Sequence, residues 1–371
     1  MKQTLSSGSI DITPYDAILL VSFGGPETKP DVMPFLENVV RGKRVPKERL
    51  LEVAEHYYGF DGKSPINDQN RDLIDALRVE LDAASIDMPI YWGNRNWHPL
   101  LGDTIEQMKQ DGIKRALAIV TSSFSSYSGC RQYRENIEMA RAQVGDDAPE
   151  IDKVRVWFNH PLFIEAITDR VKEALETLPK GRRDAARLAF TAHSIPLGMA
   201  EHCKYGEQLE EASRLVAEAL GRDHDYQLVF QSRSGPPHVP WLGPDIVEHA
   251  EALDAIGVAD LVVIPIGFVS DHMEVIFDLD VELAQAAEEL DLNVVRAGTP
   301  GVHPKFVAML VELVQERMGL VERRRALGTM GPSHDVCPQD CCLYPVRRKK
   351  HADTIPDGVE PPDSMKDTLP T

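Results

Sequence analysis

Two patterns of apolar residues alternate along the chain. Short apolar runs, many of them β-branched, predict buried β-strands, and stretches in which apolar residues recur every three or four positions predict amphipathic α-helices. Such alternation is typical of α/β folds with parallel sheets. The strands are expected at residues 17–23, 89–95, 115–123, 187–194, 226–234, 259–269 and 292–298.

The helical stretches lie between these strands and predict two similar open-sheet halves joined near residues 157–175. Helices are expected at 32–40, 47–58, 71–84, 133–144, 206–221, 246–257 and 270–285, with a last amphipathic helix at about 303–320. We expect an N-terminal domain at 14–160 that the last helix completes, and a C-terminal domain at 161–302. A cysteine-bearing extension at 321–342 and a disordered tail at 343–371, with five prolines in 29 residues, would follow.

Composition narrows the class of protein. The chain has 371 residues, of which 43% are hydrophobic and 27% charged, as in soluble globular proteins. Its net charge of −19 argues against a nucleic-acid partner, because phosphate binding depends on Lys and Arg. The first residues lack the apolar segment of an export signal, and the apolar run "LVVIPIGFV" is too short to span a membrane. We therefore expect a cytoplasmic protein without a transmembrane segment, and a monomer.

Polar loops rich in Gly and Pro follow the predicted strands. In open α/β sheets, ligands bind beyond the carboxyl ends of the strands, so these loops predict a large pocket between the two halves. The first loop lacks the third glycine of a dinucleotide fingerprint and the Gly-Lys-Ser/Thr of a P-loop, which favours a tight turn over a nucleotide site. The loops read "FGGPE", "GNRNWHP", "SSFSSYSGCRQY", "TAHSIP", "QSRSGPPHVPWLGP" and "GFVSDHMEV".

Two of these loops carry candidate catalytic residues. His193 follows a predicted strand, where an imidazole serves as a proton acceptor, a metal ligand or a hydrogen-bonded structural residue. Glu274, Asp278 and Glu282 recur every four residues on one predicted helix, although like charges at that spacing repel. The stripe is either a solvated face or a place for a cation. Apolar residues such as Phe277 predict that the helix is buried, and buried carboxylates need partners, so we favour the cation.

Cysteines are unevenly distributed. Cys337, Cys341 and Cys342 fall within six residues, whereas Cys130 and Cys203 stand alone. In a reducing compartment, clustered thiols bind metal more often than they form disulfides. The sequence predicts an iron–sulfur cluster or a structural zinc, with Cys130 or Cys203 as a fourth ligand, and unliganded thiols remain the alternative.

Taken in order, several motifs over residues 15–320 resemble those of the ferrochelatases, which insert ferrous iron into a porphyrin in haem biosynthesis. The resemblance implies an α/β fold with two Rossmann-like domains whose parallel sheets flank a porphyrin cleft. It implies that His193 and Glu274 are the proton acceptor and the iron-contacting pair, and that Asp278 and Glu282 hold or deliver a further cation. The motifs are "LLVSFGGPE", "GKSPIN", "FTAHSIP", "QSRSGPPHVPWLGP" and "PIGFVSDHMEVIFDLDVE".

The resemblance also implies substrate contacts and a cofactor. Phe23 stands where related bacterial enzymes often have a Tyr, so this chain lacks a side-chain ligand for product iron at that position. Several related enzymes carry a [2Fe–2S] cluster, for which Cys337, Cys341 and Cys342 match the tail ligands and Cys130 is our choice for the fourth. The porphyrin-binding residues implied are Phe23, Arg41, Tyr57, Ser64, Tyr127 and Tyr133.

The segment "INDQNRDLIDALRVELD" bears on the substrate. Membrane-bound animal ferrochelatases have an apolar lip there, but this segment is amphipathic and rich in charge. We therefore favour the water-soluble tetracarboxylate coproporphyrin III over protoporphyrin IX. The alternatives are a cobalt or nickel chelatase of another tetrapyrrole and, in a different class, a non-catalytic haem or metal carrier.

Overall fold

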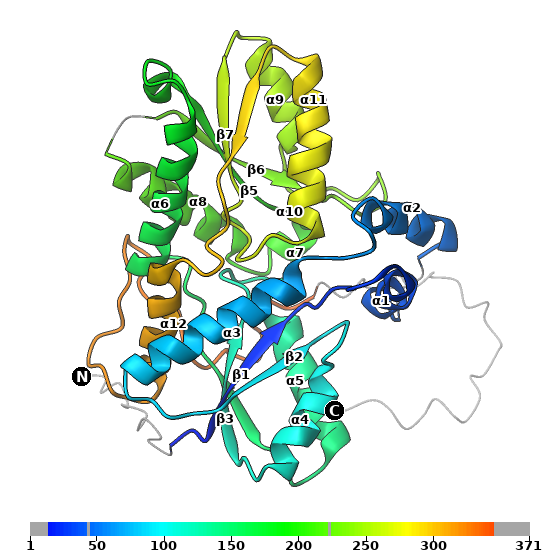
Figure 1. Cartoon of the computed structure of the whole chain (residues 1–371), viewed down its shortest axis with the longest axis vertical. Coiled ribbons are helices and arrows are strands. Elements are labelled where there is room, and N and C mark those ends of the chain that lie inside the picture. Colours follow the sequence, from blue (N-terminus) through cyan, green and yellow to red (C-terminus); the bar gives the residue numbers. More distant parts are fainter. Residues whose placement is uncertain (1–13, 43–44, 222–223, 345–371) are drawn as a thin grey trace, which may run out of the picture.

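The computed structural model describes residues 14–42, 45–221 and 224–344, and these form two parallel four-stranded sheets (Figure 1). The strand order is β2-β1-β3-β4 in the first sheet and β6-β5-β7-β8 in the second, and every pair is parallel. The expected α/β class with two parallel sheets is confirmed. The strands are β1 (Ala17–Ser22), β2 (Ile90–Asn94), β3 (Arg115–Val120), β4 (Glu150–Lys153), β5 (Arg187–His193), β6 (Tyr226–Gln231), β7 (Asp260–Ile264) and β8 (Asn293–Arg296).

The sequence patterns found seven of these strands and missed β4. Its residues Glu150–Lys153 read EIDK, which shows no apolar run, because the strand lies at the edge of the sheet and pairs on one side only, with β3. Half-exposed edge strands carry little of the hydrophobic signal on which the prediction rests.

The helices agree with the periodicity in most places. Helix α3 begins at Ile66, five residues before the expected start, directly after Pro65 at its N-cap. Helices α4, α6 and α7 were not among the expected helices, and α6 lies where we expected the segment that joins the two halves. The helices are α1 (Val32–Val39), α2 (Lys47–Tyr58), α3 (Ile66–Ala83), α4 (Leu101–Gln110), α5 (Gln132–Val144), α6 (Pro161–Thr177), α7 (Leu197–Ala200), α8 (Tyr205–Ala219), α9 (Ile246–Asp254), α10 (Met273–Phe277), α11 (Leu283–Glu289) and α12 (Pro304–Arg317).

Two short π-helical turns interrupt this regular structure, together with the 3₁₀ turns η1 (Lys29–Asp31) and η3 (Arg183–Ala185). The turn η2 (Tyr127–Arg131) precedes α5, and η4 (Asp278–Glu282) joins α10 to α11. In η4 the Leu283 N–H bonds to the carbonyl of Asp278, five residues earlier. The single regular helix that we expected over 270–285 is therefore wrong in this detail, since a wider turn lies at the centre of the acidic stripe.

A continuous hydrophobic core joins the two sheets. It contains Leu20 and Leu117 from the first sheet, Phe190 and Val262 from the second, and Phe306 from α12, all buried. In Figure 1 α12 lies beside α3, between the two sheets. We propose on this basis that each sheet centres one domain, and a shared apolar core of this kind resists relative motion of the two halves.

The chain after α12 runs back over the first half. Buried Arg155 pairs with Glu316 of α12 (Nε–Oε2 2.7 Å), and the Asn159 amide donates to the carbonyls of Leu327 and Gly331. These bonds lead the chain towards the cysteines. From residue 345 onward, the tail that we expected to be disordered lies outside the described residues. In the described part, no helix has the length and apolar character to cross a bilayer.

Candidate active site

A cavity of about 390 Å³ lies at the carboxyl ends of strands from both sheets. The first sheet contributes Arg95 after β2 and Ser122 after β3, and the second contributes His193 at the end of β5 and Phe268 after β7. The volume is within the range of small-molecule sites, and the location is the one that open α/β sheets favour. The loops expected to converge do converge.

His193 and Glu274 meet across this cavity. His193 Nε2 lies 3.5 Å from Glu274 Oε1, and the two side chains expose 31% and 45% of their surface. His193 Nδ1 bonds to the carbonyl of Ser194, which fixes the ring so that Nε2 faces the acid. The sequence prediction that this pair shares one pocket agrees with the structure.

The pair is charged in the resting protein. Burial alone would lower the pKa of His193, but the negative charge and hydrogen bond of Glu274 raise it to about 9. Burial would likewise raise the pKa of Glu274, but the positive charge of His193 lowers it to about 2. Both shifts favour an imidazolium and a carboxylate at neutral pH.

Asp278 continues the acidic stripe behind Glu274. Its Oδ2 accepts hydrogen bonds from Ser232 Oγ and, at 3.5 Å, from Gln231 Nε2. Burial, reinforced by the charges of Glu274 and Glu282, raises the pKa of Asp278 to about 7. The charge of Asp278 is therefore sensitive to pH near neutrality.

Glu282 lies at the outer end of the stripe and is exposed. Burial of part of its carboxyl, together with the charge of Asp245, raises its pKa, and Arg49 opposes that shift. The stripe thus leads from exposed Glu282 through half-buried Asp278 to Glu274, which lines the cavity.

Four of the six expected substrate contacts line the cavity, and two do not. Arg41 is exposed and donates to Asn38 of the same helical segment. Tyr127 donates to Glu135 (3.1 Å), and its ring packs on Tyr344 at 4.9 Å, away from the cavity-lining set. The residues that line the cavity are Phe23, Tyr57, Ser64 and Tyr133.

Among the cavity-lining residues that sequence reasoning did not single out, Arg95 and His272 lie next to expected site residues. Arg95 stacks over the rings of Tyr133 (4.5 Å) and Phe23 (5.6 Å), and it is the one Arg or Lys among the described lining residues. His272 caps α10, and its Nε2 lies 3.9 Å from Glu274 Oε2. Burial lowers the pKa of His272, which favours a neutral ring beside the charged pair. The signal for both was their position in polar loops after strands.

Glycine shapes the wall of the cavity at two places. Gly24 has φ +79°, and a Cβ there would lie 2.8 Å from Asn94 Cβ, so the loop after β1 turns tightly against β2. A Cβ on Gly267 would lie 2.6 Å from Ala192 Cβ, one residue before His193. The tight-turn interpretation of "FGGPE" agrees with this geometry.

The cysteines lie together next to η2, at a place that we call the cysteine site. Cys130 and Cys337 are hydrogen-bonded to each other, and Cys341 Sγ lies 3.6 Å from Cys342 Sγ. The hydrogen bond from Cys130 lowers the pKa of Cys337 to about 7, whereas burial raises that of Cys342. Cys203 also lies close enough for the charge of Cys341 to act on it. All five cysteines of the chain therefore belong to one neighbourhood.

Residues of η2 and α5 hold the cysteine loop in place. Arg131 donates to the carbonyls of Gln339 (2.6 Å) and Cys341 (2.9 Å), and Arg134 donates to that of Cys337 (3.5 Å). Cys130 belongs to the same turn, η2, whose Ser128 and Gly129 line the cavity. The turn η2 therefore contributes both to the cysteine site and to the wall of the cavity.

Comparison with known proteins decides the family. A model of the family described as ferrochelatase matches residues 15–318. The chain is 60% identical to the ferrochelatase of Rhodopirellula baltica over 91% of this chain and 96% of that protein. It is 51% identical to the coproporphyrin III ferrochelatase of Streptomyces coelicolor, over 92% and 96%. The chain belongs to the ferrochelatase family.

A ferrochelatase inserts iron into a porphyrin, a reaction that requires a site for the macrocycle, a path for the ion and an acceptor for two pyrrole protons. Family membership in this way identifies the chain as an enzyme and decides against the non-catalytic carrier. A solved structure described as SirB from Bacillus subtilis with Fe3+ shares the fold, with a TM-score of 0.52 and 13% identity over 82% of this chain and 96% of that one.

Proposed function

We propose that this ferrochelatase inserts ferrous iron into coproporphyrin III. The observation that carries the proposal is the similarity, at 51% and 52% identity over nine-tenths of the chain, to relatives named coproporphyrin III ferrochelatase. A cytoplasmic location and a monomeric state belong to the same proposal.

The surface of α3 supports a water-soluble substrate. Beside the cavity mouth, Lys63 pairs with Asp68 (2.5 Å), and Arg71 pairs with both Asp68 (2.6 Å) and Glu27 (2.5 Å). Within 66–83, Val79 is the one large hydrophobic residue that is exposed. This helix therefore offers charge rather than an apolar lip to whatever approaches the cavity.

His193 and Glu274 are the catalytic pair in this proposal. An imidazolium cannot accept a pyrrole proton, so the resting pair must first be changed. Ferrous iron that binds the Glu274 carboxylate offsets the negative charge that raises the pKa of His193, and the imidazolium then releases its Nε2 proton to water. The neutral Nε2 accepts one pyrrole proton, passes it to water and then accepts the second, so that two protons leave as the iron–nitrogen bonds form.

Asp278 and Glu282 supply the route by which iron reaches Glu274. Carboxylate oxygens replace the water ligands of a divalent cation one at a time, which spares the cost of complete dehydration in a single step. The increase in burial from Glu282 to Asp278 supports this direction of travel.

Porphyrin binding is assigned to aromatic and polar residues that line the same cavity as this pair. Phe23 and Tyr133 offer ring faces to the macrocycle, and Tyr57 and Ser64 offer hydroxyls to its carboxylates. Phe23 has no ligand atom for product iron. Arg41 and Tyr127, which the resemblance also implied, stay in the proposal only as residues for carboxylates that reach beyond the cavity.

We also propose that the cysteine site holds a [2Fe–2S] cluster on Cys130, Cys337, Cys341 and Cys342. Metal–thiolate bonds of about 2.3 Å place two sulfurs of one tetrahedral metal roughly 3.8 Å apart. The Cys341–Cys342 separation of 3.6 Å fits this distance, so the adjacent cysteines can share one metal. Bound there, the cluster would supply one-electron redox chemistry, and the four thiolates would hold it.

An anaerobic insertion assay that compares coproporphyrin III with protoporphyrin IX tests the substrate. We expect kcat/KM for coproporphyrin III to be at least tenfold higher, with Fe²⁺ as the metal. Equal values, or a preference for protoporphyrin IX, would contradict the assigned substrate. Faster insertion of Co²⁺ or Ni²⁺ in the same assay would contradict the assigned metal.

A further inference from the structure

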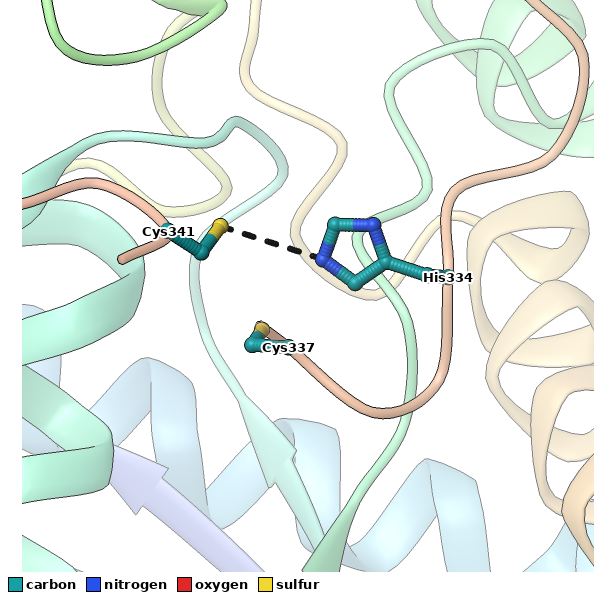
Figure 2. Close-up of side chains that lie close together, drawn as sticks. All are labelled: His334, Cys337 and Cys341. Atoms are coloured by element: carbon teal, nitrogen blue, oxygen red, sulfur yellow. Dashed lines mark hydrogen bonds between the residues drawn. The ribbon is translucent and has the colours of Figure 1, made fainter. Parts of the chain in front are cut away.

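One polar side chain contacts the cysteine site but is not among the proposed cluster ligands. His334 Nε2 lies 3.8 Å from Cys341 Sγ, and the ring points towards Cys341 from the same segment that carries Cys337 (Figure 2). The ligand atoms of His334, Cys337 and Cys341 all lie within 4.8 Å of one another. His334 is exposed, so protein packing does not force it into this position.

The four thiols already form two pairs that account for a cluster. The thiol of Cys130 is hydrogen-bonded to that of Cys337, and Cys341 Sγ lies 3.6 Å from Cys342 Sγ. A [2Fe–2S] cluster takes four ligands, so the imidazole stands beside a complete set. Its contact with Cys341 is then that of an N–H donor and a sulfur acceptor.

The two cysteine pairs differ in their surroundings. The charges of Lys153 and Arg134 act on the Cys130–Cys337 pair. In the other pair, Cys341 lies within hydrogen-bond distance of two side chains among the described residues, which are its neighbour Cys342 and His334. His334 is in consequence the group best placed to alter the electronic state of that pair.

We propose that His334 donates its Nε2–H to the Cys341 sulfur of the loaded cluster and raises the reduction potential of the cluster. The inference rests on the proposed [2Fe–2S] cluster. One-electron reduction adds a negative charge, shared with the thiolate sulfurs, and a hydrogen bond to sulfur stabilises the reduced form more than the oxidised form. His334 therefore acts through Cys341 and is a tuning residue, not a ligand.

The test is a redox titration of the full-length protein, purified without oxygen and reduced stepwise with dithionite, followed by visible absorption and electron paramagnetic resonance. Wild type, His334→Ala and His334→Gln are compared, with His238→Ala, an exposed histidine in another loop, as the matched control. We expect equal iron and sulfide content in all four proteins. The midpoint potential should fall in His334→Ala, fall less in His334→Gln, which keeps an N–H donor, and stay unchanged in His238→Ala.

Three results would overturn the inference, and they are distinguishable. An unchanged potential in His334→Ala, with the cluster present, removes His334 from the tuning role and leaves the cluster proposal intact. Loss of iron, or a changed resonance spectrum of the oxidised or reduced cluster in His334→Ala, makes His334 a ligand instead. Wild-type protein without iron and sulfide overturns the cluster proposal and this inference together.

Discussion

At the scale of single residues, His193 and Glu274 fix each other's charge. His193 Nε2 and Glu274 Oε1 are 3.5 Å apart. The charge of each residue is the largest favourable influence on the charged form of the other. Neither residue can take or release a proton without changing the pKa of its partner. A cation that competes for Glu274 therefore acts on His193 as well.

Replacing His193 separates binding from chemistry. His193→Ala should lower the rate of iron insertion by roughly 100-fold or more, the range typical for loss of a general base. The dissociation constant for porphyrin should change only a few-fold, because aromatic residues such as Phe23 still line the cavity. Anaerobic insertion kinetics and porphyrin fluorescence titration measure the two quantities. The control is His202→Ala, an exposed histidine outside the cavity, and near-normal insertion by His193→Ala would contradict the assigned base.

Asp278 should make iron binding depend on pH. Because its pKa is raised to about 7, its carboxylate loses charge as the pH falls through 7. The apparent KM for iron in the wild type should then decrease between pH 6 and pH 8, and Asp278→Asn should remove most of that dependence. Asp280→Asn is the matched control, since Asp280 pairs with Arg296 outside the stripe. Parallel KM profiles for wild type and Asp278→Asn would return the stripe to a solvated surface.

The same shift has a consequence for stability. The fold favours the protonated form of Asp278, because its pKa is higher in the folded than in the unfolded chain. This contribution to stability is complete below the ordinary pKa of 3.8 and is lost as the pH rises through about 7. Asp278→Asn should therefore have a higher Tm than the wild type at pH 8 and a similar one at pH 4. A lower Tm at pH 8 would mean that the hydrogen bonds from Ser232 and Gln231 outweigh the cost of the buried charge.

Residue roles were predictable where a chemical group coincided with a pattern. His193 closes an apolar strand, and Glu274 begins a spacing of four, so both were visible in the sequence. Arg95 and His272 were not, because their significance lies in the rings and carboxylate that they face in space. An arginine in a polar loop has the same sequence signature whether it lies in a cavity or in water.

At the scale of elements, each of the two π-helical turns carries residues that we assign to the chemistry. One, η2, carries Cys130 and part of the cavity wall, and the other, η4, carries Asp278 and Glu282. π-turns inside helices often occur at functional sites, because they widen the backbone and redirect side chains. The sequence cannot announce them, since the same residues form an ordinary helix with equal ease. The acidic spacing was predictable, but its backbone was not.

Helix α12 stabilises the molecule through a buried ion pair. Arg155 and Glu316 expose 1% and 3% of their side chains, so removing one charge leaves the other unpaired in the interior. Glu316→Gln should lower the free energy of unfolding by about 3–5 kcal/mol, measured by urea denaturation. The control Glu52→Gln breaks an exposed pair with Arg49 and should cost about 1 kcal/mol or less. Equal effects of the two variants would show that Arg155 finds another partner.

At the scale of the whole molecule, contacts between distant segments form both the cavity and the cysteine site. Arg131 meets the carbonyl of Cys341, 210 residues later in the chain, and the core beneath the cavity contains residues of both sheets. Alternating strands and helices predict the layers of such a fold, because each layer has its own periodicity. Pairings across 200 residues leave no periodic trace, which is why the choice between Cys130 and Cys203 could not be made from spacing.

Two reciprocal hydrogen bonds tie the halves together at the mouth of the cavity. The Gln69 side chain of α3 donates to the Asp271 carbonyl (3.1 Å) and accepts from the Asp271 N–H (2.8 Å). Asp271 immediately precedes His272, so these bonds hold the loop that presents Glu274. Each such bond contributes about 0.5–1.5 kcal/mol, and Gln69→Ala should release the loop from α3.

Releasing that loop should weaken both binding and insertion. Loss of both hydrogen bonds would remove about 1.4 kcal/mol of the free energy that holds the loop, which corresponds to a tenfold change in an equilibrium constant. We therefore expect Gln69→Ala to raise the porphyrin dissociation constant and to lower the insertion rate, each by about tenfold. Amide hydrogen exchange of residues 270–275 should become faster, which a purely local defect in α3 would not cause. Gln107→Ala, which breaks a bond to Asp111 on the surface of α4, is the control. Unchanged exchange in Gln69→Ala would mean that the salt bridge from Arg296 to Asp271 alone fixes the loop, and that the two halves reach their spacing through the shared core.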